Sequence, residues 1–483
     1  MNARLNKYLP VFLIVTLAIV SRVPYMLSVD FMLDGDECIM GLMSKHFYEG
    51  KELPLFFYGQ TYGFAFLEVL AISCGYMIAG VSDHVVKISV LLLWIAGCVY
   101  FYRSLLLMSN GNKGLALLVT CILILSPAWA MWSMKARGGY VSAFLVSNIV
   151  LYLSLLKSDK GVVVRFGFIG LLLVFIYQMQ PLWLPGILPF VLYSLRDRPI
   201  QKLLLLASGM IVAILFFQSI AISDGYWKPA VLGGYDSQKL STVWQYFYTN
   251  LTGYYYLTDT LQATQAAVVF VYVFVVIFLA TFVIVAYRLI RGGENKGLIV
   301  IGMLSVLLSL SYNLFIDLGS PRYALPLFGY TLLFVTIVFN QEKSRPVVSV
   351  IFVGMILIGS YSMYLFRDFR FHEISKRSTL EAVEKIKQEG VTHVYCTGPL
   401  MQWELAFYSN EDIIARYYYS TDRYMPYIKA VDSVYMVAPE RSAIVGKYGP
   451  VPDSEKTWIN YDYFICKQPS PELLNVAGFQ ISE

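Results

Sequence analysis

The sequence predicts a polytopic α-helical membrane protein with a small α/β domain at its C-terminal end. Three observations lead to this class. Of the 483 residues, 57% are hydrophobic and only 14% are charged, whereas soluble domains carry roughly 25% charged residues. Apolar runs of about 20 residues, the length that an α-helix needs to cross a bilayer, recur up to residue 366. Beyond residue 366 the composition becomes more polar, and helical and strand-like patterns alternate.

The first apolar run (YLPVFLIVTLAIVSRVPYML, residues 8–27) follows Arg4 and Lys7 and precedes no small-x-small cleavage site. We therefore expect an uncleaved helix rather than a signal peptide. A shorter run at 64–80 contains Glu68, and its length fits either a span or a half-buried segment. Ten further runs complete a prediction of about 11 spans. They lie at approximately 85–108, 114–134, 140–157, 163–179, 182–195, 200–222, 264–290, 297–316, 323–340 and 346–366.

The distribution of basic residues orients these spans. If the 64–80 run does not cross, the short connections on the N-terminal side carry about twice as many Lys and Arg residues as the longer connections opposite; if it crosses, the bias inverts. Because cytoplasmic loops are enriched in Lys and Arg, we expect a cytoplasmic N-terminus in a cell (inner) membrane. The two long connections (about 28–84 and 223–262) and the region after residue 366 then share the outer side.

The region 367–483 is predicted to form an extracytoplasmic α/β domain beyond a transmembrane domain of residues 1–366. STLEAVEKIKQEG opens with a capping box of Ser378 and Glu381 and closes on a glycine. VTHVYCT and DIIARYYY are strand-like, MQWELAFYS is helical, and RYMPYIKAVDS, VYMVAPE and YDYFICK continue the alternation. No G-x-G-x-x-G follows a strand, so nucleotide binding is unsupported. Cys396 and Cys466 are compatible with a disulfide or with two thiols.

Three carboxylates follow the first apolar run in FMLDGDECIM (31–40). They are either solvated at a helix end or part of a site. The amphipathic stretch CIMGLMSKHFY would hold them at the depth of the lipid headgroups. In YGQTYGFAFLE (58–68), two glycines permit close approach of a ligand, and Glu68 lies inside an apolar run, where ionisable groups usually face a cavity. A carboxylate at this depth suits a general base that takes a proton from an acceptor hydroxyl beside a lipid-borne donor.

Basic residues recur at two places on the predicted outer side. MKARGGY (134–140) puts Lys135 and Arg137 on an outer loop, which the positive-inside rule disfavours, and its two glycines leave backbone N–H groups able to face an anion. In SPRYALPLF, the proline keeps the preceding residue out of helical geometry, so we expect a helix to start around Arg322. Each cation either anchors a helix end at the headgroups or binds a phosphate.

Taken in order, four of these motifs resemble the GT-C superfamily of membrane glycosyltransferases: DGDE after the first span, YGQTYGFAFLE, MKARGGY after the third span, and SPRYALPLF near the last spans. Within it, the chain is similar to the bacterial and archaeal branch related to dolichyl-phosphate-mannose protein mannosyltransferases and the lipid A aminoarabinose transferase. The resemblance covers about residues 1–366 and includes a first loop with interfacial helices that do not span. The C-terminal region also looks like the outer domain of many members.

The resemblance implies a sugar donor linked to polyprenyl monophosphate, and inverting transfer to an acceptor hydroxyl on the outer face. The family often carries a second carboxylate in the second outer loop, where this chain is basic; basic side chains are therefore expected to hold the phosphate, and a carboxylate-held metal is not. The catalytic candidates are Asp36, at the matched position, Glu37 and Asp34. The candidates for the donor phosphate are Arg322, Tyr323, Lys135 and Arg137. The expected substrate cavity is lined by Tyr58, Gln60, Tyr62, Glu68 and Tyr140.

A multi-span transporter or flippase of lipid-linked glycans is the alternative class. It predicts carboxylates or broken helices near the middle of the bilayer and two similar halves, but the carboxylates lie at one interface and no half-repeat is visible. No basic, aromatic-interleaved stretch indicates nucleic-acid binding. Neither His46 nor His84 has a partner at metal-ligand spacing, so no metal site is predicted. No cofactor is assigned, and a divalent metal stays open without ligand spacing to support it. The sugar (hexose or pentose) and the acceptor (protein, lipid or glycan) stay open.

Overall fold

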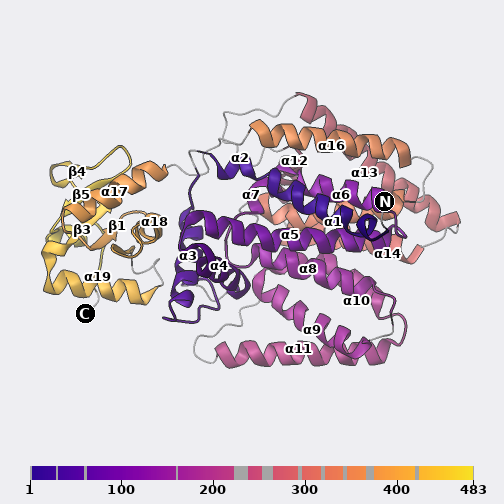
Figure 1. Ribbon diagram of the computed structural model, residues 1–483, viewed down its shortest axis with the longest axis horizontal. Coiled ribbons are helices and arrows are strands. Elements are labelled where there is room, and N and C mark those ends of the chain that lie inside the picture. Colours follow the sequence, from indigo (N-terminus) through magenta and orange to yellow (C-terminus); the bar gives the residue numbers. More distant parts are fainter. Residues whose placement is uncertain are drawn as a thin grey trace. The chain divides into compact units, whose positions relative to one another are not determined.

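The chain divides into two compact units in the computed structural model (Figure 1). The helical unit consists of Met1–Tyr25, Val90–Lys135 and Gly139–Arg367, and the mixed unit of Met26–Ser89, Ala136–Gly138 and Asp368–Glu483. The segment after the first helix therefore belongs to the same unit as the C-terminal region. The structure describes residues 3–28, 31–58, 63–158, 161–221, 238–252, 265–291, 296–316, 321–340, 345–365, 375–418 and 424–481.

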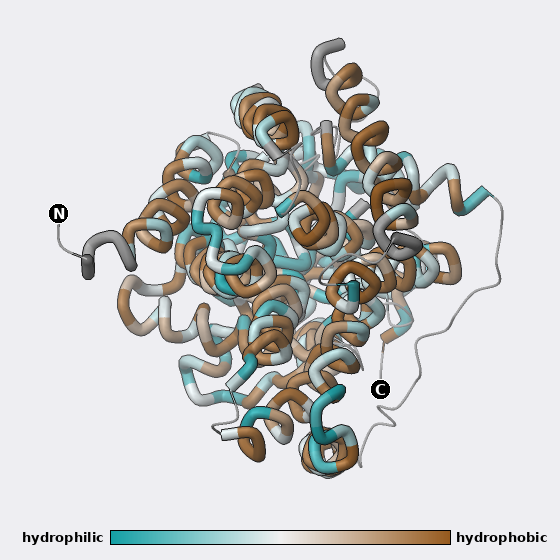
Figure 2. The backbone as a smooth tube through the Cα atoms, turned by 90° about the vertical axis from the view of Figure 1, so that its right-hand side faces the viewer, coloured by the Kyte–Doolittle hydropathy of each residue, from teal (hydrophilic) through white to brown (hydrophobic). Residues whose placement is uncertain are grey.

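Seven helices of the described chain are long and apolar enough to cross a membrane, and each coincides with a predicted span. The other four predicted spans are shorter apolar helices, so the predicted polytopic α-helical class is confirmed. Hydrophobic residues run along most of these helices (Figure 2). In chain order the elements are α1 (Ala3–Val20), α2 (Val23–Met26), α5 (Asp83–Met108), α6 (Lys113–Ile124), α7 (Pro127–Trp132), α8 (Tyr140–Leu155), α9 (Val162–Met179), η1 (Pro181–Trp183), α10 (Leu184–Ser194), α11 (Pro199–Ala221), α12 (Gln238–Thr252), α13 (Gln265–Arg291), α14 (Lys296–Phe315), η2 (Pro321–Ala324), α15 (Leu325–Phe339) and α16 (Arg345–Leu365).

The predicted span at 114–134 is interrupted. α6 ends at Ile124, and Pro127 is the first residue of α7. A proline has no N–H to donate and its ring clashes with the preceding turn, so it is favoured at the start of a helix and not inside one. Two shorter helices therefore replace the single predicted one.

Helices of the helical unit differ in how deeply they are buried. α9 and α11 lie side by side (Figure 1) and approach closely at glycines. A Cβ on Gly170 would lie 1.9 Å from the Leu206 carbonyl oxygen, and one on Gly209 would lie 1.8 Å from that of Gly167, so only glycine fits.

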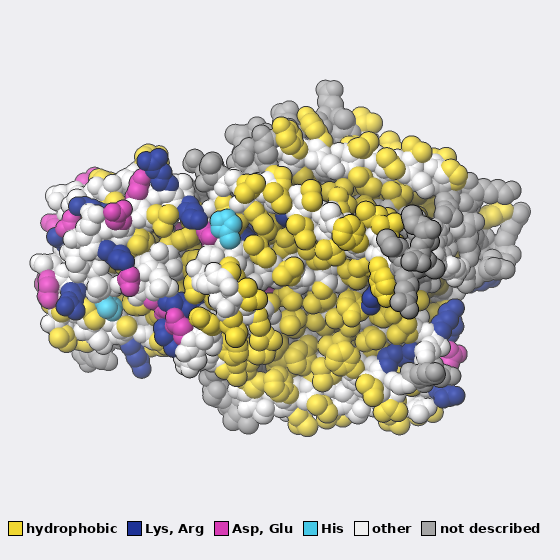
Figure 3. Space-filling view, in the orientation of Figure 1, with side chains coloured by type: hydrophobic (Ala, Val, Ile, Leu, Met, Phe, Trp, Pro, Cys, Tyr) yellow, Lys and Arg dark blue, Asp and Glu magenta, His cyan; other side chains and the backbone are white. Residues whose placement is uncertain are grey.

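α15 is buried along its whole length. On the visible face of this unit most side chains are hydrophobic (Figure 3), as expected of a surface that meets lipid.

The mixed unit begins with two helices from the first predicted loop, α3 (Gly35–Tyr48) and α4 (Phe66–Ala79), which pack against each other. The Ser73 hydroxyl on α4 donates to the Ser44 carbonyl at 2.9 Å, and the Tyr76 hydroxyl to the Gly41 carbonyl at 3.3 Å. With 14 residues, α4 is about 21 Å long, which is less than the roughly 30 Å of a hydrocarbon core. This length agrees with the prediction that 64–80 does not span.

The C-terminal part of the mixed unit is a five-stranded sheet in the order β2-β1-β3-β5-β4. β1 pairs in parallel with β2 and β3, and β5 pairs antiparallel with β3 and β4. Because β2 and β3 flank β1 on opposite sides, right-handed crossovers place α18 and α19 on opposite faces. The elements are α17 (Lys376–Gln388), β1 (His393–Cys396), α18 (Met401–Tyr408), β2 (Ile414–Arg416), α19 (Met425–Val437), η3 (Pro439–Arg441), β3 (Ser442–Gly446), η4 (Asp453–Glu455), β4 (Thr457–Trp458), β5 (Phe464–Lys467) and α20 (Pro471–Val476).

Two apolar clusters, one on each face of the sheet, give this part three layers, and the predicted α/β class is confirmed. Residues of α17 and α18 pack on the face that carries Val394 and Cys396. Residues of α19 and α20 pack on the face that carries Tyr395 and Cys466. Cys396 and Cys466 form no disulfide. β3 lies between their strands, and two strand spacings of about 4.8 Å put the backbones too far apart for one.

Two details of the predicted domain are wrong. The cap of α17 is Ser375, whose side chain accepts the Ser378 N–H at 3.2 Å, so Ser378 lies inside the helix instead of starting it. The stretch VYMVAPE does not form a strand, because its first residues extend α19, where buried Val431 and Tyr435 keep helical spacing. The strand follows at β3. The predicted division at residue 366 stays a prediction.

We predict that the C-terminal part of the mixed unit lies outside the cytoplasm. In a chain without its six native cysteines, Ser454→Cys and Glu472→Cys should react with a membrane-impermeant maleimide added to spheroplasts, whereas Lys113→Cys and Lys296→Cys should not. All four positions are exposed, so permeabilised membranes should label at each and serve as the control. The reverse pattern would mean that the 64–80 segment crosses the bilayer.

Candidate active site

The N-terminus of α3 holds the three predicted carboxylates in different ways. Asp34 is the N-cap: its Oδ1 accepts the Glu37 N–H at 3.1 Å, and Glu37 Oε2 accepts the Asp34 N–H at 3.2 Å. This reciprocal capping box satisfies two backbone N–H groups at the helix terminus. Asp34 and Glu37 are buried, whereas 33% of the Asp36 side chain is exposed. Asp36 is therefore the most accessible carboxylate of the three.

Glu37 carries its charge into the interior of the mixed unit. Its Oε1 lies 2.5 Å from Lys87 Nζ and accepts the Ala136 N–H at 3.4 Å. The Glu37 and Lys87 side chains are 1% and 10% exposed. A buried carboxylate is tolerated when it is both paired and hydrogen-bonded, and these contacts meet that requirement. One side chain thus joins the start of α3, the first turns of α5 and the 136–138 segment.

Arg137 closes the cluster. Its Nη2 lies 2.5 Å from Asp34 Oδ2, and its Nη1 lies 3.0 Å from Asp36 Oδ2. The arginine that the sequence predicts at the donor phosphate therefore bridges two of the three carboxylates. Lys87 pairs with Glu37 in the same cluster.

A short hairpin supports the segment that carries Arg137. Phe56 and Phe64 form an antiparallel bridge, and the Phe57 N–H donates to the Gly63 carbonyl at 3.3 Å. Gly138 has φ +61°, and a Cβ there would lie 2.8 Å from the Phe57 ring. Both the left-handed backbone and the close contact require glycine. Gly138 therefore lets the backbone next to Arg137 lie against the Phe57 ring.

Two other residues predicted for the substrate cavity, Tyr58 and Glu68, have different surroundings in the mixed unit. Tyr58 extends from the hairpin to His46, with 2.7 Å between its hydroxyl and Nδ1. Glu68 is fully buried in the first turn of α4. Gln60 and Tyr62 lie outside the described residues.

Within the helical unit, Arg322 lies among aromatic rings. Its guanidinium carbon is 5.3 Å from the ring centroid of Trp132 and 5.2 Å from those of Tyr140 and Tyr323. A guanidinium stacked on rings presents its N–H groups at the edge of its plane, where an oxyanion can meet two of them. Where a helix was expected to start at Arg322, one 3₁₀ turn, η2, precedes α15. Lys135 is buried in the same unit.

Arg322 and Tyr140 also line a small pocket in the helical unit. Three tryptophans and several aliphatic side chains form its apolar wall, and Gln180 adds an amide. The complete lining is Trp129, Trp132, Tyr140, Val141, Gln180, Leu182, Trp183, Arg322, Leu325 and Pro326. In the part of the chain that the structure describes, no group of three or more His, Cys, Asp or Glu side chains could hold a metal ion.

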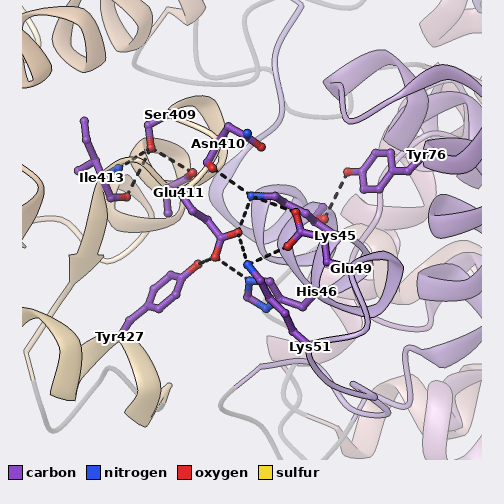
Figure 4. A network of polar contacts seen from close by, with 12 residues as sticks. Lys45, His46, Glu49, Lys51, Tyr76, Ser409, Asn410, Glu411, Ile413 and Tyr427 are labelled. Atoms are coloured by element: carbon purple, nitrogen blue, oxygen red, sulfur yellow. Dashed lines mark hydrogen bonds and ion pairs between the residues drawn. The ribbon is translucent and has the colours of Figure 1, made fainter.

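A second polar network in the mixed unit joins the C-terminal half of α3 to the turn after α18 (Figure 4). Glu411 is at its centre: Oε1 lies 2.7 Å from His46 Nε2 and accepts the Tyr427 hydroxyl at 2.8 Å, while Oε2 lies 2.5 Å from Lys45 Nζ. On the other side of the imidazole, Glu52 Oε1 lies 3.1 Å from Nδ1. We call these five residues the clasp. Lys45 and His46 are the polar residues of an amphipathic stretch that is predicted at the headgroups, but both are buried because these partners receive them.

The clasp changes the proton affinity of its members. Burial lowers the pKa of His46, but hydrogen bonds to Glu411 and Glu52 outweigh burial and raise that pKa above the ordinary 6.5. Burial likewise opposes ionisation of Glu411, yet hydrogen bonds from His46 and Lys45 hold its pKa well below the ordinary 4.5. The clasp therefore favours an imidazolium between two carboxylates.

The fold places the chain in a class of known architecture. The fold is that of two solved structures, and it agrees with the GT-C-like architecture that the sequence motifs predict. A crystal structure of ArnT from Cupriavidus metallidurans in the apo state, a lipid A aminoarabinose transferase, matches with a TM-score of 0.62 and 12% identity, over 97% of this chain and 99% of that one. A second crystal structure of that protein, bound to undecaprenyl phosphate, matches with a TM-score of 0.59 and 11% identity, over 96% and 99%. No protein-family model and no curated protein sequence matches the chain.

We predict that the Glu37–Lys87 pair is required for stability as a pair. Lys87→Met leaves a buried carboxylate uncompensated and should lower the free energy of unfolding by about 3–5 kcal/mol. The double variant Glu37→Gln/Lys87→Met should recover most of that loss, because no charge then stays buried. Denaturant unfolding in micelles measures both. Lys387→Met, which breaks the exposed pair with Asp412, is the control and should cost at most about 1 kcal/mol. If the double variant instead loses the summed free energy of unfolding of the two single variants, the pair does not act as a unit.

The clasp should also make stability depend on pH. Because the folded state raises the pKa of His46, its contribution is complete below the ordinary 6.5 and is lost as pH rises through the raised value. Glu411 has the opposite sign, so its contribution is lost only as pH falls below the ordinary 4.5. The melting temperature should therefore fall as pH increases above 6.5, and His46→Gln should flatten this fall. His84→Gln, at a half-exposed histidine, should keep it; an unchanged slope in His46→Gln would assign the effect to other groups.

Proposed function

We propose that this chain is a membrane glycosyltransferase that transfers a sugar from a polyprenyl-phosphate donor to an acceptor hydroxyl on the outer face of the membrane, with inversion at the anomeric carbon. The observation that carries the proposal is the accessible Asp36 carboxylate, placed at the start of α3 by two buried neighbours, in a GT-C fold. The resemblance to a protein with bound undecaprenyl phosphate supports the choice of donor.

In the proposed reaction Asp36 is the general base. It takes the proton of the acceptor hydroxyl as the acceptor oxygen bonds to the anomeric carbon and the bond from that carbon to the donor phosphate oxygen breaks. The leaving group is a lipid monophosphate, whose negative charge grows in the transition state. Asp34 and Glu37 orient the helix turn that carries Asp36, since their own oxygens are engaged in the capping box and in ion pairs.

Two arginines are the proposed partners of anionic groups. Arg322, which lies among Trp132, Tyr140 and Tyr323, would hold the donor phosphate through two N–H groups, with Tyr323 beside it. Arg137 holds Asp34 and Asp36 in this structure, so its proposed first role is to orient the base. The buried Lys135 stays a candidate for the phosphate, as the sequence suggests.

A transporter of lipid-linked glycans stays the alternative, but the site's chemistry favours transfer. Asp36 keeps a third of its side chain exposed while Asp34 and Glu37 are buried, and an accessible carboxylate is suited to moving a proton. The decisive experiment is mass spectrometry of envelope glycans from cells with and without the gene. A sugar that disappears with the gene, while its lipid-linked donor accumulates on the outer leaflet, would support transfer and identify both sugar and acceptor. The same loss with the lipid-linked precursor accumulated on the inner leaflet would favour the transporter.

Asp36→Asn should lower the transfer rate by roughly 10²–10⁴-fold, because the amide keeps the shape of the side chain but cannot accept the proton. Initial rates in membranes with matched amounts of protein measure the effect. Asp36→Glu is the matched variant and should keep part of the activity, since a base remains. Native transfer by a folded Asp36→Asn variant would exclude Asp36 as the base and leave Asp34 as the next candidate.

Arg322→Ala should lower turnover by roughly 10²–10³-fold, by analogy with loss of one donor to a developing oxyanion. Arg322→Lys should restore only part of the rate, because an ammonium cannot make the planar two-point contact. The same initial-rate assay separates this role from anchoring of a helix end. A fully active lysine variant would make Arg322 an anchor and leave the phosphate to other cations.

A further inference from the structure

One end of the C-terminal sheet carries three large aromatic side chains that solvent can reach. Tyr448, Trp458 and Tyr461 are 71%, 53% and 87% exposed. All three lie in the connection from β3 through β4 to β5, within residues 447–464. We call them the aromatic platform. Aromatic rings of this size bury much of their surface in most folded proteins, so three exposed ones in a single connection point to a binding surface.

Strand register places the platform at the carboxyl end of the parallel strands. Trp458 pairs with Phe464, which pairs with Gly446, the last residue of β3. Tyr448 follows that end of β3 by two residues, and Tyr461 precedes β5 by three. The last residue of β1, Cys396, pairs with Val445 at the same end. In open α/β sheets ligands bind beyond the carboxyl ends of the strands where the strand order reverses, and here it reverses around β1.

The connections that carry the rings are held in place by hydrogen bonds. The Thr397 hydroxyl, directly after β1, donates to the Tyr448 carbonyl. Asn460 Oδ1 accepts the N–H groups of Asp462 and Tyr463, each at 3.0 Å, and its Nδ2 donates to the Ser378 carbonyl at 2.9 Å. A surface that is already ordered loses little conformational entropy when it binds a ligand. The platform is therefore organised before any partner arrives.

Polar groups lie beside two of the three rings, those of Tyr448 and Tyr461. Lys447 Nζ is 5.6 Å from the Tyr448 ring centroid and 5.4 Å from that of Tyr461, and 2.8 Å from Asp462 Oδ1. The platform thus combines ring faces with a donor and an acceptor side by side. Hydroxyl groups need both, because each donates one hydrogen bond and accepts others.

The net charge of residues 447–464 indicates which kind of ligand the platform can bind. Residues 447–464 contain two lysines and three acidic residues, so the segment is slightly negative. This balance disfavours an anionic membrane surface or a nucleic acid, both of which attract an excess of Lys and Arg. Ring faces that pack against C–H groups, next to a donor–acceptor pair, suit an uncharged ligand with many hydroxyls. We propose that the aromatic platform binds a neutral glycan.

This inference goes beyond sugar transfer and does not depend on it. Its test uses the full-length chain in phosphatidylcholine nanodiscs, which avoid glycoside detergents. The probes are chitotetraose, mannotetraose and cellotetraose, titrated by calorimetry. At least one should bind, and the triple variant Tyr448→Ala/Trp458→Ala/Tyr461→Ala should weaken that binding by about tenfold or more. Since all three side chains are exposed, the variant should keep the melting temperature of the original chain.

Two controls make the result decisive. Met436→Ala/Val437→Ala removes side chains that are 56% and 85% exposed at the end of α19, which leads into the opposite end of β3, and should leave binding unchanged. Tyr461→Phe keeps the ring and should retain most of the affinity. The proposal is overturned if no probe binds, or if the platform variant binds as well as the original chain. Quenching of Trp458 fluorescence by brominated lipid, identified by its loss in Trp458→Phe, would overturn it in favour of membrane contact.

Discussion

The buried carboxylate of Glu37 is the constraint on which the candidate active site depends. A carboxylate removed from water must be neutralised and hydrogen-bonded, or it does not stay ionised. Lys87 and the Ala136 N–H meet that need, and they come from α5 and from the segment before Arg137. Compensation of one charge therefore assembles three distant segments. Once they meet, Arg137 reaches Asp34 and Asp36, and Asp36 keeps the exposure that a proton acceptor needs.

α3 is fixed at both ends by this kind of compensation. Its N-terminus has the capping box and the Glu37–Lys87 pair. Its C-terminal half has the clasp, in which His46 and Lys45 meet Glu411 from the turn after α18. A helix held at both ends has little freedom to tilt, and a general base gains from such fixed placement. The two networks also explain why α3 belongs to the same compact unit as the C-terminal sheet.

Sequence reasoning found the chemical types in the candidate site but few of their pairings. Asp34, Asp36, Glu37 and Arg137 were all named, yet nothing local indicated that Arg137 contacts the two aspartates. Lys87 lies inside the predicted span at 85–108, and a charge at such a place is itself a signal of a site, but the sequence does not show that its partner is Glu37. Glu411 was not identified, since 365 positions separate it from His46 and its turn has no motif. Errors at helix ends were smaller, as with Ser375, where two serines compete to cap one helix.

The class of the protein and most of its helices and strands follow from the local sequence. A bilayer requires long apolar segments that satisfy their own backbone hydrogen bonds, and a half-buried helix or strand requires apolar residues at its own period. Both requirements concern residues that are close together in the sequence, so the sequence reveals them. Only the tertiary structure decided which charges pair and which segments form each unit. An ion pair depends on distances between side chains far apart in the chain, and burial makes those distances decisive by removing water as the alternative partner.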